Sequence, residues 1–125
     1  MSLPTSIKTE SRRYKENNDC SVKAIAIATH TTYAIAHRAL KAAGRKNNSY
    51  ATPSMMQKAL NALGFVFRAV KTYVGNTAKT IKLPSYYNFV AFGVGHTLAI
   101  VNGKVADHTS GSNYGIQRVY RVVPA

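Results

Sequence analysis

The chain has 125 residues, of which 46% are hydrophobic and 10% aromatic, a composition that predicts one folded domain and excludes a disordered segment. Lys and Arg number 17 against 4 Asp and Glu, and the resulting net charge of +13 favours anionic partners such as nucleic acid or an acidic protein surface. The single cysteine excludes an intramolecular disulfide and a four-Cys zinc site.

The first segment, residues 1–17, is polar and basic, and we expect it to form an extended arm before a single domain over residues 18–125. It contains no apolar stretch of the kind found in signal peptides. No apolar run in the chain approaches the roughly 18 residues needed to cross a bilayer. We therefore expect no membrane partner, and a lone thiol fits a reducing compartment.

The first half of that domain shows helical periodicity in three places. Residues 20–29 are apolar on nearly every face, which indicates a buried helix, and Asp19 just before them is a candidate N-cap. Residues 33–43 and 53–63 predict two further helices, the last one starting with a proline in its first turn.

The second half changes to the pattern of strands. Asn102-Gly103 between two apolar runs is a strong two-residue hairpin signal. Residues 77–83 fit either a short helix or a strand. Strands are expected over residues 65–70, 87–92, 96–101, 104–107 and 116–123. Helices followed by an antiparallel sheet predict an α+β fold.

Cys20 is expected in the first turn of the buried helix, and a helix N-terminus favours the thiolate form of a cysteine. A small buried apolar residue is the alternative role for a lone cysteine. A catalytic thiol also needs an imidazole that exchanges protons with it and a polar group that orients the imidazole.

His96 and Asp107 are the candidates for these two partners. A two-residue turn at Asn102-Gly103 pairs residue 101 with 104 and, further along, residue 98 with 107. On this register His96 and Asp107 meet on one face of the sheet. Asp107 is the only acidic residue after position 19, which favours a functional role over a turn cap or an arginine partner.

An oxyanion hole requires hydrogen-bond donors close to the thiolate. The backbone N–H of Cys20 is one candidate, and the side-chain amides of Asn17 and Asn18 are others. Both asparagines fit the alternative role of loop or cap residues equally well. No cofactor or metal is expected.

The chain resembles a family of small papain-like cysteine peptidases of bacteriophages and bacteria, which are similar to the double-glycine leader peptidases of bacteriocin exporters. The resemblance extends over residues 14–122, and its specific parts are the Asn-Asp-Cys block at 18–20 and the Gly-His…Asp block at 95–107. It departs from the leader peptidases at Ser21, where those proteins have glycine.

The resemblance implies a papain-like fold, in which a buried helix begins with the nucleophilic Cys20 and packs on an antiparallel sheet that carries His96 and Asp107. It implies a thiol hydrolase, of peptidase, isopeptidase or amidase type, acting on a peptide or protein substrate that the positive charge would select for acidity. It also places the protein in the cytoplasm of a bacterial host or in a phage virion.

The alternative is a papain-fold protein without catalytic activity. Such a protein would act as a basic virion factor, or bind a host protein or nucleic acid, through Arg12-Arg13 and the loop at residues 44–48.

Overall fold

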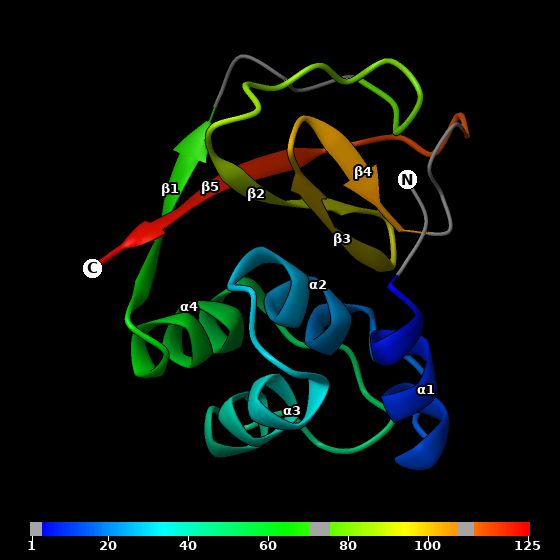
Figure 1. Cartoon of the computed structure of the whole chain (residues 1–125), viewed down its shortest axis with the longest axis vertical. Helices are drawn as coiled ribbons and strands as arrows, with labels where there is room; N and C mark the ends of the chain where they lie inside the picture. The colour runs from blue at the N-terminus through cyan, green and yellow to red at the C-terminus, as the bar shows by residue number, and fades with distance from the viewer. Residues whose placement is uncertain (1–3, 71–75, 108–111) are drawn as a thin grey trace.

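The structure, a computed structural model, describes residues 4–70, 76–107 and 112–125 and has an α+β architecture (Figure 1). Its helices are α1 (Thr5–Arg13), α2 (Cys20–Ala28), α3 (Tyr33–Ala42) and α4 (Pro53–Ala62). Its strands are β1 (Phe65–Val70), β2 (Asn88–Gly93), β3 (His96–Val101), β4 (Lys104–Ala106) and β5 (Arg118–Pro124). All neighbouring strands are antiparallel, in the spatial order β1-β5-β2-β3-β4. The α+β prediction is therefore confirmed.

Helix α2 is the central helix because its sequence is apolar on nearly every face. Every residue from Cys20 to Ala28 except Lys23 is buried. Its alanines let the helix backbone approach the sheet closely, and Val22 and Ile25 are fully enclosed. None of the described helices is both long enough and apolar enough to cross a membrane.

The starts of α3 and α4 follow from their capping residues, whereas α1 and α2 begin without a side-chain capping bond. The side chains of Thr32 and Thr52 accept hydrogen bonds from backbone N–H groups in the first turns of α3 and α4, as Ser and Thr caps do. The prediction that Asp19 caps α2 is wrong, because its side chain makes no capping bond. Its carboxylate instead binds side chains from other elements.

The sheet has a core on each face. Residues of α2, α3 and α4 cover one face, and the segment 76–87 crosses the other (Figure 1). The buried side chains of that segment are those of Ala78, Ile81 and Leu83. The ambiguous residues 77–83 therefore form neither a helix nor a strand, apart from one bridge between Thr77 and Gly115.

The expectation of an extended N-terminal arm is wrong, because residues 5–13 form helix α1. Ile7 is 6% exposed and packs in the core, and Ser11 is also buried. Ser11 Oγ donates a hydrogen bond to Asp19 Oδ2. A single apolar residue and one serine, spaced one helical turn apart, thus attach a mostly polar segment to the domain.

Glu16 connects the segment before α2 to the loop after α3. Its carboxylate accepts hydrogen bonds from Arg45 Nη1 at 2.8 Å and from the backbone N–H of Asn48 at 2.6 Å, and it contacts His37 Nε2 at 2.6 Å. The side chains of Arg45 and Glu16 are only 2% and 1% exposed. Arg45 is therefore not a surface charge of the loop at 44–48, contrary to the expectation that this loop offers its basic residues to a partner.

The Glu16 carboxylate is ionised across the ordinary pH range. Burial alone would raise the pKa of Glu16, but hydrogen bonds from Arg45, Asn48 and His37 outweigh it and lower the pKa from 4.5 to about 2. A lowered pKa means that this carboxylate stabilises the fold above about pH 4.5. That contribution is lost as the pH falls through about 2.

We predict that Glu16→Gln lowers the free energy of unfolding by about 3 kcal/mol at pH 7, because it leaves Arg45 buried without a counter-charge. The substitution should also flatten the acid-induced loss of stability between pH 4.5 and 2. Urea unfolding followed by circular dichroism at a series of pH values measures both effects.

The matched control is Glu10→Gln. Glu10 pairs with Arg13, whose side chain is 71% exposed, so its removal should cost less than about 1 kcal/mol. Equal losses in the two variants would show that the buried pair contributes no more than a surface pair.

Candidate active site

Cys20 is the first residue of α2, and the chain reaches it through a sharp turn. Asn18 has a φ of +53°, a left-handed conformation that asparagine tolerates better than most residues. The thiol borders a cavity of about 210 Å³. The cavity is lined by Asn18, Asp19, Cys20, Lys23, Tyr50, Gly95, His96 and Asp107.

His96 and Asp107 are brought together by the β3–β4 hairpin. The register pairs Val101 with Lys104 and Ala99 with Ala106, as the two-residue turn at Asn102-Gly103 predicts. Continued by one residue, it places Asp107 opposite Leu98, two positions from His96 and on the same face of the sheet. His96 Nε2 lies 2.7 Å from Asp107 Oδ2, and the two side chains are 15% and 5% exposed. The predicted meeting of these two residues is thus present.

The imidazole of His96 also reaches the thiol of Cys20. The hydrogen bond with Asp107 and a second one with Cys20 raise the pKa of His96 from 6.5 to about 9, although burial opposes the shift. Because Nε2 faces Asp107, Nδ1 is the ring nitrogen left for the sulfur. Negative charge on Asp107 and on Cys20 adds to the effect, so the site favours the protonated form of the His96 imidazole.

Tyr114 packs against this pair and was not identified from the sequence. Its hydroxyl donates to the carbonyl oxygens of His96 at 3.2 Å and Val94 at 3.4 Å, and its ring meets the imidazole edge to face at 5.4 Å. Burial, followed by the negative charges of Cys20 and Asp107, raises the pKa of Tyr114. The phenol thus stays protonated and holds the backbone that carries His96.

The sequence feature that relates to Tyr114 is the pair of glycines just before His96, Gly93 and Gly95. A Cβ at Gly93 would lie 2.2 Å from Tyr114 Oη and 2.4 Å from the carbonyl oxygen of Gly115, distances that real Cβ atoms do not adopt. Glycine at 93 is needed so that the tyrosine can lie against the strand. The sequence showed that something approaches closely there, but not which residue.

Asp19 stabilises the residue immediately before the nucleophile. Its carboxylate accepts hydrogen bonds from Ser11 Oγ and from Tyr33 Oη at 2.8 Å, and it pairs with Lys23 Nζ at 3.2 Å. Burial and the neighbouring Asp19 raise the pKa of Tyr33, which keeps that hydroxyl a donor. Helices α1, α2 and α3 are therefore joined at a buried carboxylate adjacent to Cys20.

The two candidate oxyanion donors occupy different positions. Asn18 lines the cavity, although its Nδ2 donates one hydrogen bond to the Asn48 carbonyl oxygen at 3.2 Å. Asn17 is exposed, and its backbone N–H donates to Asn48 Oδ1 at 2.6 Å. The structure therefore brings Asn18, and not the side chain of Asn17, to the cavity of Cys20.

The site contains protein groups for acid–base and nucleophilic chemistry. Within residues 4–70, 76–107 and 112–125, no three His, Cys, Asp or Glu side chains gather closely enough to hold a metal ion. Comparison of the chain with family models, with curated proteins and with solved structures finds no match.

We predict that Gly93→Ala lowers the free energy of unfolding by about 2 kcal/mol, because the new methyl group must displace Tyr114 or the strand. Thermal or urea unfolding measures the loss. Gly115→Ala is the control, since nothing lies within 4 Å of a Cβ at that position, and we expect a change below about 1 kcal/mol. A tolerated Gly93→Ala would show that the space beside His96 is not occupied as described.

The charge of His96 predicts a pH-dependent selectivity in alkylation of Cys20. An imidazolium attracts anionic iodoacetate but not neutral iodoacetamide. The rate of Cys20 alkylation by iodoacetate, divided by the rate with iodoacetamide, should therefore fall as the pH rises through about 9 and His96 loses its proton. The hydrogen bond with Asp107 contributes most to the raised pKa of His96. In Asp107→Asn this pKa should be lower, so the fall in the rate ratio should occur at lower pH. Rates are read by mass spectrometry at the single cysteine.

The control for this titration is His30→Asn. His30 is exposed and has a φ of +55°, which asparagine accepts, so the fold should be retained. Its rate ratio should follow that of the unsubstituted protein. A ratio that does not change around pH 9 in the unsubstituted protein would contradict the raised pKa of His96.

Proposed function

We propose that this protein is a thiol hydrolase in which Cys20 is the nucleophile, His96 exchanges protons with it, and Asp107 orients the imidazole. The observation that carries the proposal is that His96 is hydrogen-bonded to both Cys20 and Asp107 beside an open cavity. A helix that begins with cysteine and packs on an antiparallel sheet carrying histidine and then aspartate is also the arrangement of a papain-like peptidase.

In the first half of the reaction, the Cys20 thiolate attacks the carbonyl carbon of an amide or ester. The C–N or C–O bond to the leaving group then breaks, and the His96 imidazolium gives its proton to the departing nitrogen or oxygen. The product is a thioester on Cys20 and a neutral imidazole. Asp107 stabilises the imidazolium before this transfer and keeps Nδ1 directed at the sulfur.

In the second half, neutral His96 accepts a proton from a water molecule, whose oxygen attacks the thioester carbonyl. The bond to sulfur breaks, a carboxylic acid is released that loses its proton to solvent, and the thiolate and imidazolium form again. The raised pKa of His96 favours the return of the proton to the imidazole, which closes the cycle.

The tetrahedral intermediates require donors for the oxyanion. Backbone N–H groups in the first turn of α2 have no acceptor within the helix, and they border the thiol. Asn18 lines the same cavity. We assign the oxyanion to the Cys20 N–H together with Asn18, and leave out Asn17 because it does not line the cavity.

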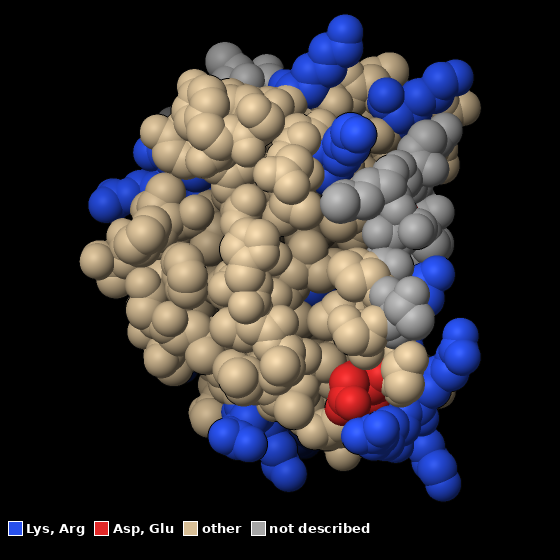
Figure 2. Space-filling view, in the orientation of Figure 1, with Lys and Arg blue, Asp and Glu red and all other residues tan. Residues whose placement is uncertain are grey.

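The substrate of the proposed reaction is a peptide or protein. The cavity opens to the surface, and Tyr50 and Gly95 border it, so an extended chain can pass the thiol. Basic side chains are spread around the face shown in Figure 2, whereas acidic side chains are visible there at one place only. The excess of 17 Lys and Arg over 4 Asp and Glu attracts acidic substrates in preference to basic ones.

The hydrolase proposal predicts turnover of an unselective activated ester, p-nitrophenyl acetate. Mass spectrometry should find an acetyl group on Cys20, and more than one equivalent of nitrophenol per protein should be released because the thioester is hydrolysed. Cys20→Ala should form no acetyl adduct. His96→Ala should form and hydrolyse it at least about a hundred-fold more slowly, since it removes the proton-transfer group.

His30→Asn again serves as the control, because it removes an exposed imidazole remote from the thiol, and it should match the unsubstituted protein. Acetylation that stops at one equivalent, or equal rates in His96→Ala and the unsubstituted protein, would contradict the proposal. Either result would favour the alternative of a papain-like scaffold that binds a partner without catalysis.

A further inference from the structure

Two arginines face each other on the sheet without any acidic neighbour. Arg68 on β1 is directly opposite Arg121 on β5 in the antiparallel register, so both side chains leave the sheet on the same face. Like charges in this relation repel each other and destabilise a sheet. The four acidic side chains of the chain pair elsewhere, with Arg13, Lys23, His37, Arg45 and His96. No carboxylate of the fold therefore compensates this repulsion.

The pair lies far from the cavity of Cys20. Phe67 packs into the core beneath the helices, so Arg68, the next residue along the strand, projects from the opposite face. Arg121 is opposite Phe89 of β2, which belongs to the core under the segment 76–87. The arginines are thus at the β1–β5 edge of the sheet, whereas His96 begins β3 near the other edge.

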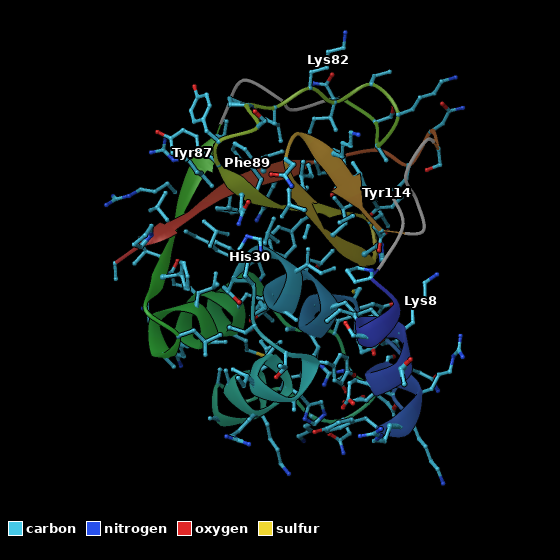
Figure 3. The ribbon with its side chains drawn as sticks, in the orientation of Figure 1. Lys8, His30, Lys82, Tyr87, Phe89 and Tyr114 are labelled. Atoms are coloured by element: carbon cyan, nitrogen blue, oxygen red, sulfur yellow. The ribbon has the colours of Figure 1, made fainter. Side chains whose placement is uncertain are left out.

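Aromatic rings accompany the two arginines. The guanidinium carbon of Arg121 lies 4.4 Å from the centre of the Tyr87 ring, and its Nε is buried without a hydrogen-bond partner. The ring of Tyr86 is 4.7 Å from that of Tyr87, and Tyr86 is 78% exposed. Figure 3 shows Tyr87 and Phe89 where β1, β5 and β2 come together. We call Arg68, Arg121, Tyr86 and Tyr87 the Arg68–Arg121 surface.

We propose that the Arg68–Arg121 surface binds single-stranded nucleic acid. Two arginines at directly opposed positions on one face can contact the same negatively charged phosphodiester strand, and arginine forms bidentate hydrogen bonds with phosphate oxygens. The stacking of Arg121 on Tyr87 holds one guanidinium in place before the ligand arrives.

The exposed ring of Tyr86 supplies the second contact of this ligand. A base can stack on it only when the base is unpaired, which favours single strands over duplex. A net charge of +13 adds the long-range attraction that nucleic acid requires. This inference does not depend on the hydrolase proposal, because the surface shares no residue with the cavity of Cys20.

Fluorescence anisotropy with a labelled oligothymidylate of about 20 nucleotides tests the inference. Arg68→Gln should weaken binding about ten-fold. It should also make the negative slope of log association constant against log salt concentration shallower by about 0.7, the value for one phosphate contact on a single strand. Tyr86→Ala should weaken binding about ten-fold and leave the salt slope unchanged, because stacking releases no counterion. Both side chains are exposed, so neither variant should unfold at a lower temperature than the unsubstituted protein. Arg68→Gln should unfold at a slightly higher temperature, because it removes the repulsion between Arg68 and Arg121.

Arg38→Gln is the matched control, since Arg38 is exposed on α3 and the variant loses the same charge. It should change affinity less than about two-fold. Equal weakening in Arg38→Gln and Arg68→Gln would overturn the inference and leave only a non-specific effect of net charge. Duplex DNA that binds as tightly as the single strand, or heparin that competes equally well with no effect of Tyr86→Ala, would also overturn it.

The experiment separates this inference from the hydrolase proposal. Arg68→Gln and Tyr86→Ala should keep the p-nitrophenyl acetate turnover of the unsubstituted protein. Turnover without binding would reject the nucleic-acid surface alone, and binding without turnover would reject the hydrolase alone.

Discussion

The packing of helix α2 against strand β3 is the contact on which the rest of the structure depends. The helix is apolar on nearly all sides and is buried except at Lys23, so it can lie only between the sheet and the other helices. Once it is there, its first residue, Cys20, is held beside the first residue of β3, His96. The hydrophobic effect thus places a thiol and an imidazole in contact although they are 76 positions apart in the chain.

The chain has few acidic residues, and three of its carboxylates connect separate elements around the cavity of Cys20. Glu16 joins the approach to α2 with the loop after α3, Asp19 joins three helices next to the thiol, and Asp107 orients His96. The chain has 17 Lys and Arg, and the one that pairs with Glu16 through its guanidinium is Arg45, which is buried with it in the interior. The geometry around Cys20 therefore rests on buried polar groups that are satisfied by hydrogen bonds, whose loss is costly.

The sheet separates two regions of different chemistry. The cavity of Cys20 lies where β3 begins and β4 ends, and its groups form and break covalent bonds in the proposed reaction. The Arg68–Arg121 surface lies near the other edge of the sheet and on the face away from the helices. No acidic side chain pairs with those arginines, so a bound anion would relieve their repulsion, whereas Lys23 and His96 beside Cys20 already pair with carboxylates of the fold.

Local patterns in the sequence determined the helices α2, α3 and α4, the β3–β4 hairpin, and the approach of Asp107 to His96, because each depends on periodicity, capping or turn chemistry within a few residues. Only the tertiary structure decided that residues 5–13 are helical, that Asp19 binds Ser11 and Tyr33 instead of capping α2, and that Tyr114 fills the space at Gly93. These features depend on contacts between residues distant in the chain. A polar segment such as α1 carries too little periodic signal to reveal them, and its helix forms because Ile7 and Ser11 find partners in the folded domain.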